Sequence, residues 1–232
     1  MSFSTLDGFG FDALRSRPTW PAAVRRLKLL WDRAGDNAKS RAEEYGEVYA
    51  GRRGAMVVDV VASRQRRYNE RVLPDVARWE AGVEEPTLKQ LAGDQPGLSL
   101  LRLPSKELET IVSVAQGFLR FADERGLGED DACQAWATEV ESFEHAPTLD
   151  SYVGDVKGIG VALFAYMRMR CGTDALKPDL RVRNALNRLG FDVPNDPHAI
   201  LITGQGAAIE IGVSPLVLDQ LLWWATDFAE VI

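Results

Sequence analysis

The chain has 232 residues and a formal net charge of −7, with 46% hydrophobic and 26% charged residues. This length predicts one large domain or two small ones, and the apolar content is sufficient for a folded core. No apolar run approaches the ~20 residues of a membrane span, and we identify no secretory signal. Because the chain has only 2 cysteines and 2 histidines, we expect no metal and a reduced, cytoplasmic protein. We also expect no cofactor and no membrane partner.

Charge is distributed unevenly along the chain. Residues 15–71 contain 14 Lys or Arg against 7 Asp or Glu, and residues 150–190 contain 7 against 4. Between them, residues 72–149 contain 6 against 15, and residues 191–232 contain six acids and no Lys or Arg. The overall negative charge argues against nucleic acid as a partner. Two basic segments brought together by the fold would nevertheless form a positive face on an acidic protein.

The spacing of apolar residues predicts helices along most of the chain. Single apolar stripes with helical spacing run through residues 24–31, 108–119, 182–189 and 218–228. The run Met56–Val61 is ambiguous, because its β-branched residues favour a strand, whereas no second strand with hairpin spacing is present to pair with it. We interpret this run as a buried helix.

The segment Lys157-Gly158-Ile159-Gly160-Val161 has unusual glycine spacing between two apolar stretches. Glycines at alternate positions permit a tight turn between two helices and expose backbone N–H groups at the start of the second helix. Such a helix start binds anions, and a DNA phosphate fits it without regard to sequence. A lone Gly-x-Gly is also common in plain helix connectors, so this segment alone does not decide between the two interpretations.

Asp179 stands directly before the helical stripe of residues 182–189, in the sequence Lys177-Pro178-Asp179-Leu180. Taken alone, it is most simply an N-cap that satisfies a free amide and stabilises the helix by roughly 1 kcal/mol. A carboxylate held at a helix start can also face the same cleft as the hairpin and act chemically there.

The order of helix, Gly-Ile-Gly hairpin, apolar helix, short loop and Pro-Asp resembles the helix-hairpin-helix DNA glycosylase superfamily, in its endonuclease-III-like branch. The similarity covers roughly residues 50–230, and Gln65 looks like the glutamine of the loop that follows the family's buried helix. The chain also departs from the family. Ala162 stands where bifunctional members carry a lysine, Lys157 replaces the usual proline, and Phe164 fills a position that is usually small. The four-cysteine cluster of many relatives is missing as well.

The resemblance implies an all-α fold with two helical lobes, a helix-hairpin-helix motif and a DNA-binding cleft between the lobes. We expect an N-terminal segment, residues 1–47, to pack with a C-terminal lobe, residues 175–232, that carries the aspartate. A central lobe, residues 48–174, would contain the helix-hairpin-helix motif at about 149–172.

The function that the resemblance implies is that of a monofunctional DNA glycosylase in base-excision repair. Asp179 would stabilise positive charge on the sugar or direct the attacking water while the N-glycosidic bond is hydrolysed. The partner would be double-stranded DNA containing a lesion or mismatch, bound by a monomer, associated with the nucleoid if the source is bacterial. The sequence does not distinguish alkylated purines, uracil, mismatched thymine or oxidised bases. Two alternatives remain open: a non-catalytic helix-hairpin-helix DNA-binding protein, and a protein-interaction module on a glycosylase scaffold.

Removing a base from a duplex requires a plug for the gap and a pocket for the extruded base. By resemblance Gln65 is the plug, although the charged residues around it also fit a solvated helix face. Asp59, inside an apolar run, is either a pocket group or a buried acid with satisfied hydrogen bonds. The candidate DNA contacts are Lys157, Gly158, Ile159, Gly160, Val161, Gln65, Arg64, Arg66, Arg181 and Arg183, and the candidate pocket residues are Tyr68, Trp136, Phe143 and Tyr152.

Overall fold

The computed structural model describes residues 11–93 and 95–224. Within these residues the secondary structure is helical, with no strand, which confirms the all-α class expected from the apolar spacing. The chain divides into two compact units. Unit 1 combines the residues up to Glu43 with those from Leu176 onwards, and unit 2 runs from Glu44 to Ala175.

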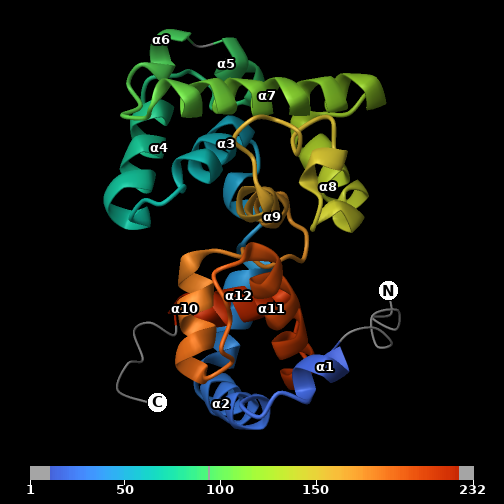
Figure 1. The fold of residues 1–232 in the computed structure, drawn as a ribbon. Coiled ribbons are helices and arrows are strands. Elements are labelled where there is room, and N and C mark those ends of the chain that lie inside the picture. Colours follow the sequence, from blue (N-terminus) through green and yellow to red (C-terminus); the bar gives the residue numbers. More distant parts are fainter. Residues whose placement is uncertain (1–10, 94, 225–232) are drawn as a thin grey trace. The chain divides into compact units, whose positions relative to one another are not determined.

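Figure 1 labels the helices of both units. Unit 1 contains α1 (Phe11–Arg15), α2 (Trp20–Glu44), α10 (Leu180–Leu189), α11 (Pro197–Ile211) and α12 (Pro215–Trp224). Unit 2 contains η1 (Glu47–Tyr49), α3 (Arg53–Ala62), η2 (Tyr68–Val72), α4 (Leu73–Glu80), α5 (Leu88–Gly93), α6 (Gln95–Leu98), α7 (Ser105–Arg125), α8 (Glu129–Glu139), η3 (Glu141–Phe143), η4 (Pro147–Leu149) and α9 (Val161–Arg170). Of the short elements, η2 is a π-helical turn and the other three are 3₁₀ turns.

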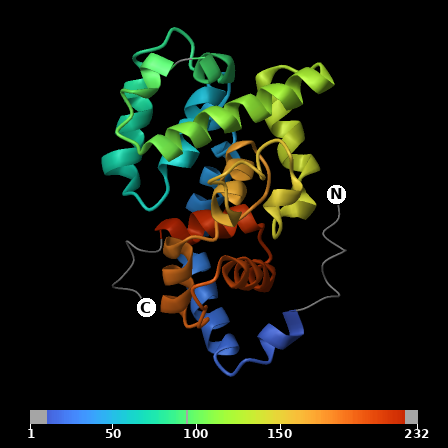
Figure 2. The ribbon, with the colours of Figure 1, turned by 45° about the horizontal axis from the view of Figure 1, so that its top comes forward.

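Helix α3 forms the centre of unit 2. All ten of its residues are buried, and it packs against α4, α5, α7 and α9. Figure 1 and Figure 2 both show α7 running past α3 on one side of this unit. Because α3 is covered on every side, its sequence has no polar face and no apolar stripe. The interpretation of Met56–Val61 as a buried helix is therefore confirmed.

An aromatic cluster joins α7, α8 and α9. The ring of Trp136 meets Phe118 edge-on at a centroid distance of 4.9 Å and Phe164 at 5.5 Å. Edge-to-face contacts are a favourable arrangement for aromatic rings, so the bulky Phe164 is accommodated by perpendicular packing. The indole Nε1 of Trp136 donates a hydrogen bond to Asp150 Oδ2 at 2.9 Å.

Asp150 also shapes the segment that leads into the hairpin. Its Oδ2 accepts hydrogen bonds from the backbone N–H groups of Val153, at 3.0 Å, and Gly154, at 2.8 Å. These bonds hold residues 151–155 in a turn, where the expected helix-hairpin-helix motif would have its first helix. Gly117 on α7 permits the close approach of this turn, because a Cβ there would lie 1.9 Å from the carbonyl oxygen of Tyr152.

Unit 1 is built around the apolar face of α2. Trp20 at its start meets Phe191 edge-on at 4.8 Å, and the ion pair Arg15–Glu210, at 2.8 Å, joins α1 to α11. Helices α10, α11 and α12 pack against one another. The apolar stripes of residues 24–31 and 182–189 are confirmed as parts of α2 and α10. The stripe that begins at residue 218 lies on α12, and residues 225–228 fall outside the described residues.

Candidate nucleic-acid interface

The glycine hairpin is a tight turn at the start of α9. The N–H of Ile159 donates to the carbonyl of Val156 at 2.9 Å, and Gly158 has a φ of +105°, which favours glycine. Gly160 is the N-cap of α9, in an extended conformation and without a side-chain cap. The first intrahelical bond runs from Phe164 N–H to the Gly160 carbonyl at 2.9 Å. The amides of the first turn of α9 therefore follow an exposed glycine, which is the arrangement that an anion site requires.

Two side chains from elsewhere in unit 2 hold the hairpin in place. Arg64 donates a hydrogen bond from its guanidinium to the carbonyl of Gly158. The hydroxyl of Thr110 on α7 lies 2.9 Å from the carbonyl of Lys157 and 2.8 Å from that of Lys106. The hairpin, the loop after α3 and the start of α7 thus meet at one place.

The loop after α3 carries the expected plug. Gln65 has a φ of +51°, an uncommon conformation for a residue with a side chain, and it is exposed. On either side of it, Arg64 binds the hairpin carbonyl and Arg66 forms an ion pair with Glu107 at 2.7 Å. The two arginines anchor the loop, and Gln65 lies at its exposed tip.

Lysines stand next to this loop and hairpin. Lys157 is exposed on the hairpin itself, and Lys106 is exposed in the first turn of α7. The backbone carbonyls of both lysines are within hydrogen-bond distance of the Thr110 hydroxyl, so the two lysines lie close together along the backbone. Sequence reasoning missed Lys106 and Thr110. Their helical spacing of four residues was a signal that they share one face of α7.

Asp179 lies in unit 1, at the N-cap of α10. Its Oδ1 accepts hydrogen bonds from the backbone N–H groups of Arg181, at 2.9 Å, and Val182, at 3.0 Å. Its Oδ2 lies 3.7 Å from the ammonium of Lys177, and the side chain is 24% exposed. The capping role is thus present in full, and it uses one of the two carboxylate oxygens.

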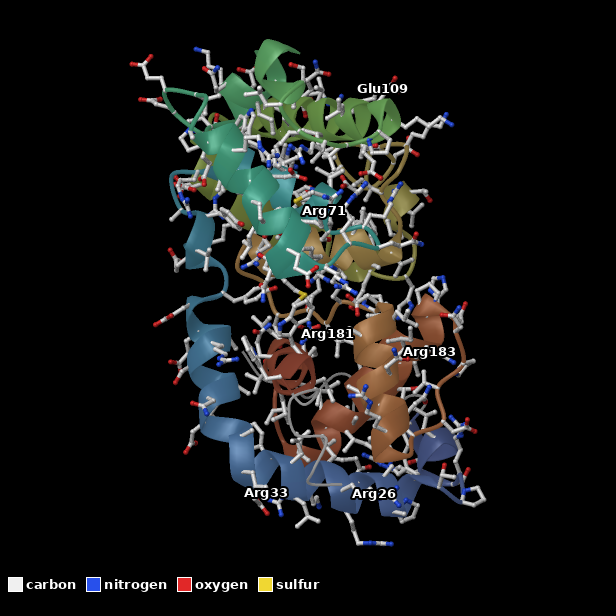
Figure 3. All side chains as sticks on the ribbon, turned by 90° about the vertical axis from the view of Figure 1, so that its left-hand side faces the viewer. Arg26, Arg33, Arg71, Glu109, Arg181 and Arg183 are labelled. Carbon is white, nitrogen blue, oxygen red and sulfur yellow. The ribbon has the colours of Figure 1, made fainter. Side chains whose placement is uncertain are left out.

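The two candidate arginines on α10 are bound within unit 1, and Figure 3 labels both of them. Arg181 donates from Nε and from a terminal nitrogen to the carbonyl of Trp223, at 3.1 and 2.7 Å. Arg183 donates from Nε to the carbonyl of Val193 at 3.0 Å. Both guanidinium groups therefore stabilise the packing around α10, and any phosphate contact would use their remaining N–H groups.

Two of the four candidate pocket residues, Trp136 and Tyr152, make aromatic packing contacts in unit 2. Trp136 is completely buried in the aromatic cluster. Phe143 is half-buried in η3. Tyr152 is half-buried, and its ring meets Phe121 edge-on at a centroid distance of 5.1 Å. Its hydroxyl donates a hydrogen bond to the carboxylate of Glu124. The fourth candidate, Tyr68, belongs to a different environment.

Tyr68 is part of a buried polar network around Asp59, which is completely buried. The hydroxyls of Tyr49, Tyr68 and Tyr166 donate to Asp59 Oδ2 at 2.9, 3.1 and 3.1 Å. The guanidinium of Arg170 lies 3.2 Å from the same oxygen. Asp59 is therefore a buried acid with satisfied hydrogen bonds, the second of the two interpretations of its place in an apolar run.

The same network perturbs the acidity of its members. Burial raises the pKa of the Tyr49, Tyr68 and Tyr166 phenols, and the neighbouring Asp59 charge adds to the effect. Burial acts to lower the pKa of Arg170, but Tyr166 and Asp59 outweigh it and hold that pKa well above its usual value. Sequence reasoning missed Arg170 and Tyr166, because Tyr166 is 107 residues from Asp59 along the chain, and it also missed Tyr49, which is only 10 residues from Asp59.

Comparison of the chain with protein-family models, curated proteins and solved structures found no match.

Within the described residues no single helix has the length and hydropathy of a membrane span, although α11 and α12, bent by 98° at their junction, meet both criteria as a pair. No group of three or more His, Cys, Asp or Glu in the described part of the chain is arranged to hold a metal ion.

Proposed function

We propose that the protein is a monofunctional DNA glycosylase that hydrolyses the N-glycosidic bond of a damaged or mismatched base in double-stranded DNA. One observation carries the proposal: in unit 2, the glycine hairpin and the Gln65 loop are joined directly by the Arg64–Gly158 hydrogen bond. A phosphate-binding hairpin beside an exposed polar loop tip is the pairing that base extrusion requires, since the backbone must be held while the gap is filled.

The proposed chemistry depends on Asp179. Departure of a base leaves positive charge on the deoxyribose, and a nearby carboxylate stabilises that charge. At a separation of ~4 Å and an effective dielectric constant of ~20, the attraction is about 4 kcal/mol, or roughly a thousandfold in rate. Because capping uses Oδ1, the oxygen that would face the sugar or orient the attacking water is Oδ2, which lies 3.7 Å from the ammonium of Lys177.

Gly160→Ala is expected to weaken binding to all DNA sequences roughly tenfold while leaving the fold intact. The extended backbone of Gly160 suits alanine, and a Cβ there meets no atom within 4 Å, so the fold should be unaffected. We expect the added methyl group to stand in the space through which a phosphate approaches the amides. Loss of one amide–phosphate hydrogen bond costs about 1.5 kcal/mol, which is about tenfold in Kd. The measurement is the Kd for duplexes of several sequences.

Gly128→Ala is the matched control for this prediction. Gly128 is also an uncapped, extended N-cap with open space around its Cα, at the start of α8. We expect its substitution to leave the Kd unchanged. Equal affinities of the two variants would show that the hairpin amides do not bind phosphate.

Borohydride should trap no covalent complex between the protein and an abasic duplex. Strand-cleaving relatives use an amine to form a Schiff base with the sugar, whereas here the corresponding residue is Ala162, in the first turn of α9. Water is then the nucleophile, and the product is an intact strand with an abasic site. The readout is a shifted band on a denaturing gel. A trapped complex that disappears in Lys157→Ala would show that the hairpin lysine supplies the amine, and the monofunctional assignment would be wrong.

The experiment that tests the proposal is a panel of duplexes, each with one damaged or mismatched base. Each duplex is incubated with the protein and then treated with alkali, which cuts the strand at abasic sites. The panel includes alkylated purines, uracil, mismatched thymine and oxidised bases. Cleavage after alkali, but not before it, is the expected result with at least one substrate. No cleavage with any of them, under conditions of measured DNA binding, would contradict a glycosylase.

A second candidate function is favoured by the environment of Asp179. The hydrogen bonds of this carboxylate are those of an ordinary N-cap, with a lysine ammonium 3.7 Å from the other oxygen. This environment supports the alternative proposal of a DNA-binding protein of the helix-hairpin-helix type without catalysis. Salt-sensitive duplex binding with no abasic product would support it, because each phosphate contact lowers log K by about 0.9 per decade of salt. Absence of duplex binding would instead favour a protein-interaction role.

A further inference from the structure

Helix α12 contacts the chain on both sides of Asp179. The carboxylate of Asp219 accepts a hydrogen bond from the backbone N–H of Lys177 at 3.0 Å, two residues before Asp179. One turn further along α12, the carbonyl of Trp223 accepts two hydrogen bonds from the guanidinium of Arg181, two residues after it, at 3.1 and 2.7 Å. Lys177 and Arg181 are four residues apart, as are Asp219 and Trp223. One face of α12 therefore holds both ends of the segment from Lys177 to Arg181.

Both residues that join α12 to this segment make additional contacts. The guanidinium of Arg181 also lies 3.6 Å above the ring centre of Trp223, so it is bound by a carbonyl and an aromatic face together. Asp219 is 3% exposed, and the buried Gln220 donates to its Oδ2 at 3.2 Å. Between the two contacts, Asp179 N–H donates to the Lys177 carbonyl at 2.8 Å. The backbone at Asp179 is thus connected to Asp219 through a single residue of rigid chain, Pro178.

A buried carboxylate is a costly way to pack one helix against another. Its desolvation must be offset by hydrogen bonds, and an apolar side chain of similar size would stabilise the packing at least as well. The function that an apolar residue cannot provide is to fix one particular backbone amide. In this chain, that amide belongs to the residue that sets the path of the chain into Asp179.

We propose that Asp219 is a positioning residue for Asp179, and that α12 acts as a clamp, defined as Asp219 and the Trp223 carbonyl, on residues Lys177 to Arg181. The inference rests on the proposed catalytic role of Asp179. The clamp holds the carboxylate in one place while the sugar develops charge. A displacement of about 1 Å at a reacting group costs on the order of a hundredfold in rate, so a loosened clamp lowers the rate without weakening DNA binding.

The test compares Asp219→Ala with Leu218→Ala, a completely buried neighbour on α12 that is not part of the clamp. The first readout is hydrogen exchange of the amides of Lys177, Arg181 and Val182, which report the clamp and the cap in the free protein. In Asp219→Ala we expect these amides to lose at least about tenfold in protection, the equivalent of one hydrogen bond of about 1.4 kcal/mol. In Leu218→Ala we expect exchange to change evenly over α12 and α10. The same change at all these amides in both variants would overturn the proposal.

The second readout is single-turnover base release on the substrate found with the duplex panel. Asp219→Ala should lower the rate about a hundredfold with an unchanged Kd for DNA, and Asp219→Asn, whose amide oxygen accepts the Lys177 N–H, should restore most of it. If Asp219→Ala and Leu218→Ala both lose rate only in proportion to their loss of folded protein, the positioning role is overturned. If Asp219→Ala does not fold, Asp219→Leu fills the space without providing an acceptor and is used in its place. If no substrate is found, the proposed function fails, and hydrogen exchange still decides whether the clamp exists.

Discussion

Asp179→Asn is expected to reduce base release by about a thousandfold or more while DNA affinity stays within about threefold. Asparagine has the same size and keeps an oxygen that can accept from the Arg181 and Val182 amides, and it is among the best N-cap residues. The fold and the start of α10 are therefore preserved. What is lost is the negative charge that opposes the developing cation on the sugar. Single-turnover rates and the Kd for the same duplex separate the two effects.

A second aspartate of unit 1 provides the control. Asp196 caps α11, with Oδ1 accepting from Ala199 N–H at 2.8 Å, so Asp196→Asn also removes one charge and keeps one cap. We expect this variant to release base at the wild-type rate. A wild-type rate for Asp179→Asn on a verified substrate would contradict the catalytic assignment, and equal losses in the two variants would trace the effect to net charge.

Asp59→Asn is expected to destabilise unit 2 by about 3–5 kcal/mol, because it leaves the buried Arg170 guanidinium without its counter-charge. The side chains of Asp59 and Arg170 are 0% and 7% exposed, so water cannot replace the lost partner. That loss is a large fraction of the ~5–15 kcal/mol by which domains are usually stable. Urea unfolding followed by far-UV circular dichroism gives the free energy of unfolding.

A double-mutant cycle locates the source of this effect. Asp59→Asn combined with Arg170→Met removes both charges, so we expect the double variant to lose less stability than the two single variants added together. Glu70→Gln is the control, because Glu70 and its partner Arg67 have side chains 63% and 80% exposed and both can turn to water. Its expected cost is about 0–1 kcal/mol. Additive losses in the cycle would mean that Asp59 and Arg170 stabilise the unit independently.

The helices that periodicity alone could predict are those with one buried face, whereas the fully buried α3 was inferred because its run has no partner strand. In α7 and α10, apolar residues recur at helical spacing and polar residues fill the other side, so periodicity alone is informative. Helix α11 was not predicted, because its apolar residues are spread around its circumference and glycines interrupt them. The short turn before the hairpin could not be predicted either, since it depends on hydrogen bonds to Asp150.

For the candidate site, the sequence indicates residue types and local turns, and it does not indicate distant partners. Alternate glycines predict the hairpin because glycine readily adopts a φ of +105°, as Gly158 does. That Arg64 binds the Gly158 carbonyl depends on chain segments 94 residues apart. The hydrogen bonds from Arg181 to Trp223 join residues 42 positions apart, and they give that arginine a structural role beside the phosphate contact expected of it.

The division of unit 1 between the two ends of the chain has a consequence for biosynthesis. Helix α2 leaves the ribosome early, but α10, α11 and α12, its packing partners, follow only after the whole of unit 2. At about 5–20 residues per second, the delay before α12 is complete is roughly 10 to 40 s. During that time Trp20 and Leu27 of α2, which are both buried in the finished protein, lack their final neighbours. Unit 2 is continuous and can fold meanwhile, so the nascent chain carries an unpaired amphipathic helix that a chaperone would recognise.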